Sequence, residues 1–171
     1  MEIELLVLRI IHVVGAILWG GTAMFVAFFL MPAMGMAGPA GAPVMGALVK
    51  RRLFVIVPTV AVITMLAGLR LLWRISDGYS AAYFATSAGM TYFIGTIVSI
   101  TGFAIFLTVS RPALGKMGTL QQQMAQAAES ERGALMTQMN AVRGRAGAAA
   151  KAIALLLIIA TVTMAIARYM N

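Results

Sequence analysis

Residues 53–73 decide the fold class, and they read LFVIVPTVAVITMLAGLRLLW. The stretch contains one ionisable residue, Arg70, close to its end. The hydrocarbon core of a bilayer is roughly 30 Å thick and is crossed by about 20 helical residues. Because lipid offers the backbone no hydrogen-bond partner, a spanning stretch of this kind must be helical. Residues 53–73 are therefore predicted to form a transmembrane helix, which Pro58 should kink.

Three further apolar runs flank this helix, at residues 5–30, 88–109 and 149–167. Of the 171 residues, 61% are hydrophobic and only 11% are charged. A soluble domain of this size needs more polar residues to cover its surface. The sequence predicts an all-α integral membrane four-helix bundle in a single domain, residues 1–171. Glu2 and Glu4 precede the first run, where a secretory signal would carry basic residues, so we expect that helix to be retained.

The first and third connections are predicted to contain short helices. Residues 31–43 are rich in Gly and Pro and predict a turn, after which Pro43 begins a helix that runs through residues 50–52 into the second span. In the third connection, Pro112 and residues 115–118 indicate another turn. Thr119 and Gln122 then form a capping-box pattern. We expect a cytoplasmic helical extension over residues 119–146, with a break at Gly144 or Gly147 before the fourth span.

A thin apolar stripe marks one face of this predicted extension. Its members follow alternating steps of three and four residues, interrupted by one glutamate: Leu120, Met124, Ala127, Glu131, Leu135, Met139 and Val142. Such a stripe can bind a partner protein, pack against a neighbouring helix or lie on the membrane surface.

Thirteen Lys and Arg residues predict the orientation. Nine of them fall in the first and third connections: Lys50, Arg51, Arg52, Arg111, Lys116, Arg132, Arg143, Arg145 and Lys151. Four fall on the other side: Arg9, Arg70, Arg74 and Arg168. The positive-inside rule places the richer side in the cytoplasm, so both termini are expected outside. The net charge of +8 then reflects topology rather than nucleic-acid binding.

His12 is the residue most suited to chemistry, because an ionisable group within a span is costly and raises a functional hypothesis. Residues at spacings of three, four and seven share its helix face: Arg9, Gly15, Ala16 and Trp19. Gly15 and Ala16 predict a shallow notch beside the imidazole, which a flat ligand or a neighbouring helix can approach. Other spans are expected to bring Arg70, Met164 and Arg168 to the same outer layer.

This layer is suited to a b-type haem. Imidazole and thioether ligate haem iron axially, and arginines pair with propionates. The candidate cofactor-binding residues are His12, Arg9, Trp19, Arg70, Met164 and Arg168. His12 is also the candidate metal ligand, either for haem iron alone or for copper with methionine support. In the alternative interpretation His12 is structural and hydrogen-bonds a neighbouring helix, while the arginines reach the headgroups.

Several functional classes are excluded or disfavoured. The chain has no cysteine, which excludes disulfides and thiolate metal sites. It has one histidine, which excludes sites built from three histidines. No nucleophile–base pair, carboxylate pair or phosphate loop is present, so a non-enzymatic role is favoured. No Asp or Glu lies within a predicted span, which argues against a proton-coupled or cation-coupled transporter.

The first span carries a resemblance to known families. Residues 12–21, HVVGAILWGG, resemble the His-x6-Trp-x-Gly opening of the copper-resistance D family and its four-helix relatives. Those relatives include the membrane protoporphyrinogen oxidase of bacteria. Together with residues 38–41 before the basic residues 50–52 and the ending at residues 164–169, the chain resembles an uncharacterised bacterial family of small four-helix membrane proteins. The resemblance implies a bacterial inner-membrane location and a haem-associated histidine at His12.

Three functions follow as hypotheses. The chain can be an accessory or structural subunit of a larger respiratory or photosynthetic membrane complex, a haem b-binding membrane protein, or a copper-handling protein. We favour the first, because packing against lipid and other membrane subunits, or against copies of itself, requires no catalytic residues. The oxidase family pairs its histidine with a lysine in a later span, whereas the one lysine within a predicted span here, Lys151, lies at the very start of the fourth.

Overall fold

A computed structural model describes residues 3–170, and it is helical throughout, with no strand in that part of the chain. Glu2 lies outside the described residues. In chain order the elements are α1 (Ile3–Phe25), η1 (Val26–Leu30), α2 (Met31–Ala37), η2 (Gly38–Gly41), α3 (Ala42–Lys50), α4 (Leu53–Ile75), α5 (Ala81–Phe84), α6 (Ser87–Ile105), η3 (Phe106–Ser110), α7 (Arg111–Gln126) and α8 (Glu129–Ala167). The all-α prediction is confirmed.

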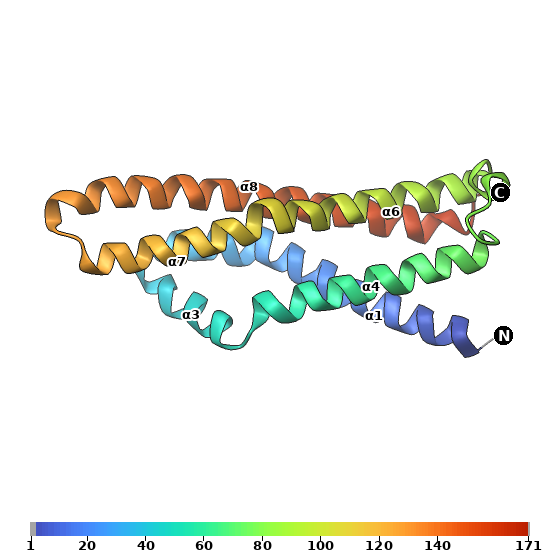
Figure 1. Cartoon of the computed structure of the whole chain (residues 1–171), viewed down its shortest axis with the longest axis horizontal. Coiled ribbons are helices and arrows are strands. Elements are labelled where there is room, and N and C mark those ends of the chain that lie inside the picture. The colour runs from blue at the N-terminus through green and yellow to red at the C-terminus, as the bar shows by residue number, and fades with distance from the viewer. Residues whose placement is uncertain (1–2, 171) are drawn as a thin grey trace.

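Four helices are long and apolar enough to cross a membrane: Ile3–Ala37, Leu53–Ile75, Ser87–Gln126 and Glu129–Ala167. They contain the four predicted apolar runs. Both ends of the described chain lie at one end of the molecule, next to the connection from α4 to α6, and we call this the terminal end (Figure 1). The opposite end, which α7 and α8 form, is the hairpin end (Figure 1).

The four long helices pack as two pairs. The packing of α1 against α4 and of α6 against α8 is much more extensive than the packing between the pairs. Small residues bring the partners close together in each pair. A Cβ atom on Gly15 would lie 2.1 Å from Thr64 Oγ1 of α4, and one on Gly95 would lie 2.7 Å from Thr163 Oγ1 of α8. Each seam therefore depends on glycine.

A small core joins the two pairs. Trp19 of α1, Ala61 of α4, and Ile153 and Leu157 of α8 are buried together. The Trp19 ring also meets Phe103 of α6 edge-on, with 6.2 Å between the ring centroids. All four spans therefore converge on Trp19, which lies in the protein interior rather than in an interfacial aromatic belt.

Two prolines that were predicted to mark turns lie inside continuous helix instead. Pro32 and Pro112 are each the second residue after a π-helical stretch, η1 and η3 respectively. A proline cannot donate the usual i→i−4 hydrogen bond and its ring crowds the carbonyl four residues earlier. The wider π turn just before each proline accommodates both effects. The predicted turn at residues 31–43 therefore shrinks to η2, and the predicted turn at Pro112 and residues 115–118 is wrong.

The third connection folds as a helical hairpin rather than as one helix over residues 119–146. The chain reverses at Ala127 and Ala128, whose backbones are extended, and α8 continues through Gly144 and Gly147 without a break. Leu120 of α7 and Met139 of α8, both members of the predicted apolar stripe, are buried. The stripe thus contributes to packing between α7 and α8. Thr119 does not start a helix, because it lies inside α7, where its hydroxyl donates to the Gly115 carbonyl one turn earlier, at 3.3 Å.

The short helix in the first connection begins as predicted and ends earlier than predicted. Pro43 lies in the first turn of α3. The helix ends at Lys50, and Arg52 has a left-handed backbone with φ of 57°. The chain therefore turns sharply between α3 and α4, and the predicted continuous helix through residues 50–52 is wrong.

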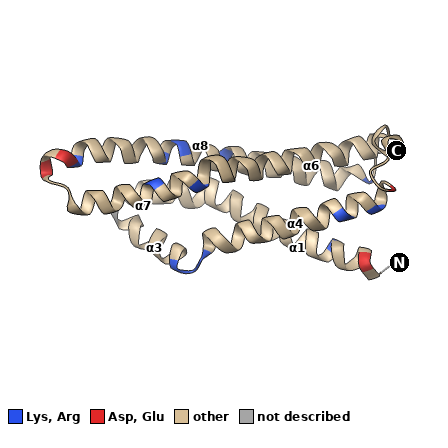
Figure 2. Cartoon of the chain, viewed as in Figure 1, with Lys and Arg blue, Asp and Glu red and all other residues tan. Residues whose placement is uncertain are grey.

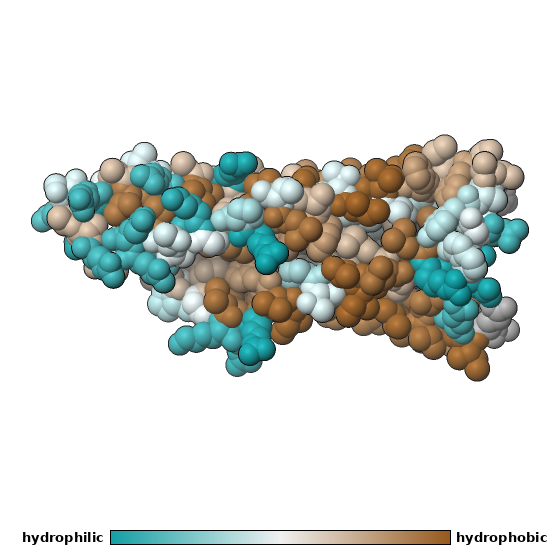
Figure 3. Space-filling view, viewed as in Figure 1, coloured by the Kyte–Doolittle hydropathy of each residue, from teal (hydrophilic) through white to brown (hydrophobic). Residues whose placement is uncertain are grey.

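Charge and hydropathy divide the molecule along its length. Figure 2 shows basic residues along α7, α8 and the link from α3 to α4, with the acidic residues of the hairpin at its tip. A smaller charged group lies at the terminal end (Figure 2). Figure 3 shows a mainly hydrophobic surface over the part nearer the terminal end and a mainly hydrophilic surface over the hairpin. The apolar part is the one suited to contact with lipid.

Candidate functional site

His12 lies in the seam between α1 and α4. Its Nδ1 atom is 2.8 Å from the carbonyl oxygen of Thr64. A carbonyl oxygen only accepts hydrogen bonds, so in this arrangement Nδ1 carries the hydrogen and donates it. In the neutral ring, Nε2 then has no hydrogen and offers a lone pair. The Thr64 hydroxyl is used within its own helix, donating to the Val60 carbonyl at 2.8 Å.

Gly68 makes room for the imidazole. A Cβ atom at Gly68 would lie 2.6 Å from Cε1 and 2.8 Å from Nδ1 of His12, which is closer than packed atoms approach. One turn away in the same seam, Thr64 of α4 fills the notch over Gly15 of α1. The predicted notch beside His12 therefore exists, and a neighbouring helix occupies it.

The predicted arginines of α1 and α4 lie near the terminal end. Arg70 contacts Glu4, with Nη2 at 2.6 Å and Nε at 2.8 Å from Oε1, and its guanidinium lies 4.4 Å above the Trp73 ring. Arg74 Nε is 3.8 Å from the other Glu4 oxygen. The Arg70 and Glu4 side chains are 44% and 42% exposed, so this ion pair contributes at most about 1 kcal/mol. Arg9 is exposed.

The remaining candidates contact other parts of the bundle. Trp19 belongs to the core described above. Met164 lies in the seam between α8 and α6, where its Cγ would be 3.0 Å from a Cβ atom on Gly95. Arg168 donates to the Tyr169 hydroxyl and lies over its ring, and this hydrogen bond raises the pKa of the guanidinium. His12 and Met164 thus face different helices, α4 and α6 respectively.

The sequence interpretation missed the partners of His12 and of Arg70. Thr64 and Gly68 lie four residues apart and share a helix face, which is a signal that can be read in the sequence once α1 is known to pack on α4. Glu4 was interpreted only in relation to a signal peptide, although it is the acidic partner of two arginines that follow much later in the chain.

Aromatic residues gather at the terminal end. Tyr79 donates from its hydroxyl to the Leu69 carbonyl at 2.8 Å, and its ring is 6.5 Å from that of Phe84. Burial, and then the neighbouring Tyr92, raise the pKa of the Tyr83 hydroxyl. All four tyrosines of the chain lie in the α4–α6 connection, in the first turns of α6 or just after α8. This distribution is typical of an interfacial aromatic belt.

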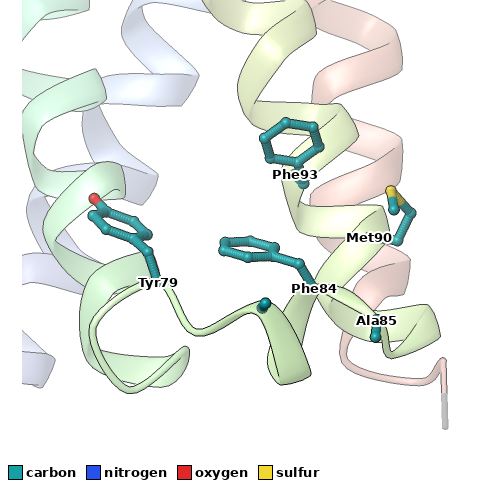
Figure 4. A pocket seen from close by; sticks show the side chains of 6 residues that line it. Tyr79, Phe84, Ala85, Met90 and Phe93 are labelled. Atoms are coloured by element: carbon teal, nitrogen blue, oxygen red, sulfur yellow. The ribbon is translucent and has the colours of Figure 1, made fainter.

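An open apolar hollow of about 480 Å³ lies within this aromatic region. The residues that line it are Tyr79, Ala81, Phe84, Ala85, Met90 and Phe93. Figure 4 shows the Tyr79, Phe84 and Phe93 rings around the gap between the end of α4 and the start of α6. Because its one polar group, the Tyr79 hydroxyl, is bound to Leu69, the hollow suits hydrocarbon better than a polar substrate.

Within residues 3–170 no three His, Asp or Glu side chains gather as a metal site would require. The one imidazole of the chain, that of His12, stands apart from any such group. No known protein family, no curated protein and no solved structure matches the chain.

Proposed function

We propose that this chain is a small accessory subunit of a larger complex in a bacterial inner membrane, of the respiratory or photosynthetic kind. The observation that carries the proposal is the structural role of His12. Its ring binds the Thr64 carbonyl and packs over Gly68, so the one imidazole of the chain helps to join two helices. The outward faces of the spans are left with apolar side chains.

The third span supports a role in packing against other membrane helices. It has the smallest buried fraction of the four, and a row of its apolar side chains points outward: Met90, Phe93, Ile94, Ile97 and Ile100. The row follows the three-and-four spacing of one helix face. Such a face can be covered by lipid or by helices of another subunit, and only the second gives the chain a place in a complex.

Purification from the native membrane in a mild detergent tests this proposal. The tagged chain, of 18.1 kDa, is expected to co-elute with other membrane proteins in a fixed ratio, identified by mass spectrometry after native electrophoresis. A second tag position serves as the control for tag-driven association. Elution as a monomer or homodimer would contradict the proposal.

A second candidate function is binding of haem b, and the His12 tautomer favours it. Metal-ligating histidines almost always donate their other ring N–H to a carbonyl, carboxylate or water. His12 has this arrangement through Nδ1 and Thr64, which leaves Nε2 for an axial bond. Arg9, Arg70 or Arg168 would then pair with the propionates.

The same purified protein tests this candidate by its absorption spectrum. A bound haem is expected to give a Soret band that is lost in His12→Ala and kept in Met164→Leu, because Met164 packs toward α6 rather than α4. A colourless, folded preparation would rule out the haem. Copper bound to the same preparation, and lost in His12→Ala, would instead support the copper-handling alternative.

We further propose that the hairpin end is cytoplasmic and that both termini are outside, as the distribution of basic residues favours. The cysteine-free chain allows a direct test. With single cysteines at Met170 or Ala128, a membrane-impermeant maleimide applied to intact spheroplasts is expected to label Met170→Cys only. Ala128→Cys should react after lysis. The reverse pattern would overturn the orientation.

A further inference from the structure

The α3 corner, which we define as residues 42–52, is an apolar helix followed by a basic run. The helix carries no charged residue before Lys50, and none of its nine residues is buried. Val44 and Val49 are 49% and 57% exposed. In Figure 1, α3 leaves the bundle and lies apart from α8. Its apolar face therefore needs a cover from outside the chain.

The depth of the α3 corner follows from α4. The helix from Leu53 to Arg70 rises about 26 Å at about 1.5 Å per residue, close to the roughly 30 Å of a hydrocarbon core. The charged side chains at the two ends of this stretch, Arg51 and Arg52 at one and Arg70 at the other, extend toward the lipid headgroups. Arg51 and Arg52 thus mark one boundary of the hydrocarbon, and the end of α3 that directly precedes them lies at the headgroup level.

The basic run lacks an acidic partner within the described part of the chain. Of the four acidic residues there, Glu4 and Asp77 lie at the terminal end, and Glu129 and Glu131 lie at the tip of the hairpin. The left-handed backbone of Arg52 makes the chain turn at this run. Figure 2 shows the link between α3 and α4 as a basic corner at the margin of the molecule. The negative charge that balances this basic run therefore has to come from outside the described chain.

We propose that the α3 corner is a binding surface for anionic phospholipid. Lys50, Arg51 and Arg52 contact lipid phosphates, and the apolar side chains of α3 enter the boundary between headgroups and acyl chains. Apolar helices with flanking Lys and Arg bind anionic membrane surfaces in this way. The surface is continuous with the lipid-facing side of α4, which begins at the next residue. This role goes beyond that of a subunit and holds whether or not the chain joins a complex.

A fluorophore on the α3 corner tests this inference. The chain has no cysteine, so Val44→Cys accepts a single environment-sensitive label. The labelled protein is placed in nanodiscs of phosphatidylcholine alone or mixed with phosphatidylglycerol, and quenching is measured with neutral acrylamide. The quenching constant is expected to be several-fold lower in the anionic discs. This protection should disappear in about 1 M salt, where the Debye length falls to about 3 Å.

Charge variants identify the residues responsible. Lys50→Gln, Arg51→Gln and Arg52→Gln together are expected to abolish the difference between the two lipids. The matched control, Arg132→Gln with Arg143→Gln and Arg145→Gln, removes the same charge from α8 and should keep the difference. Equal protection in both lipids, or equal loss in both triple variants, overturns the proposal. Protection of the label from acrylamide in detergent also overturns the proposal, because a second copy of the chain would then cover α3. The salt titration needs no charge variant, so it still tests the proposal if a triple variant misfolds.

Discussion

Replacing Gly15 with alanine is expected to destabilise the protein by about 1–3 kcal/mol, the usual cost of overpacking a well-filled site. The new Cβ atom would lie 2.1 Å from Thr64 Oγ1 and 3.2 Å from Thr64 Cβ. The Thr64 hydroxyl is held by its hydrogen bond to Val60, so relief requires that this bond break or that α1 and α4 separate. Thermal unfolding in detergent should show a Tm lowered by about 2–4 °C for each kcal/mol lost.

Two controls separate this clash from the general effect of alanine in a helix. Gly21 lies on the same helix, and a Cβ atom there would meet nothing within 4 Å, so Gly21→Ala is expected to be neutral or mildly stabilising. Adding Thr64→Ala to Gly15→Ala removes the closest atom, and part of the lost stability should return. If Gly15→Ala and Gly21→Ala behaved alike, the close approach of α1 to α4 would be wrong.

The positions of the spans were predictable because hydrocarbon thickness and apolar composition leave few alternatives. The structure of the connections between the spans was harder to predict. Gly115 and Gly118 suggested a turn, and Gly144 or Gly147 a break in the helix, yet all of them lie within helices. The real reversal falls between α7 and α8, at two alanines with no local turn signal. The reversal lets α7 pack on α8, which buries Leu120 and Met139.

The candidate site was predictable in its central residue and not in its partners. An ionisable residue in an apolar run identifies His12 from the sequence alone. Its partner is the carbonyl of Thr64, and a backbone group leaves no mark in a sequence pattern. Met164 was placed near His12 by depth alone, whereas the structure places it in the other helix pair. Depth along a bundle follows from spacing, but the face that a helix presents depends on its neighbours.

The contact between His12 and Gly68 predicts compensating substitutions. Gly68→Ala alone is expected to cost about 1–3 kcal/mol, because its Cβ atom would lie 2.6 Å from the imidazole. His12→Ala alone loses the hydrogen bond to Thr64, worth about 0.5–1.5 kcal/mol, and also the ring contacts. In the double variant the alanine methyl at residue 68 enters space that the ring has left. Its destabilisation should be smaller than the sum of the two by about 0.5–3 kcal/mol.

The unchanged protein, the two single variants and the double variant form a double-mutant cycle, and thermal unfolding of all four is measured in one detergent. His12→Ala combined with Gly21→Ala is the matched control and should be additive, since nothing lies near the Gly21 position. His12→Phe keeps a ring over Gly68 and removes the donor, so its cost isolates the hydrogen bond to Thr64. Additivity of His12→Ala and Gly68→Ala would mean that the ring does not lie over Gly68. The assignment of His12 to the seam between α1 and α4, on which both candidate functions depend, would then fail.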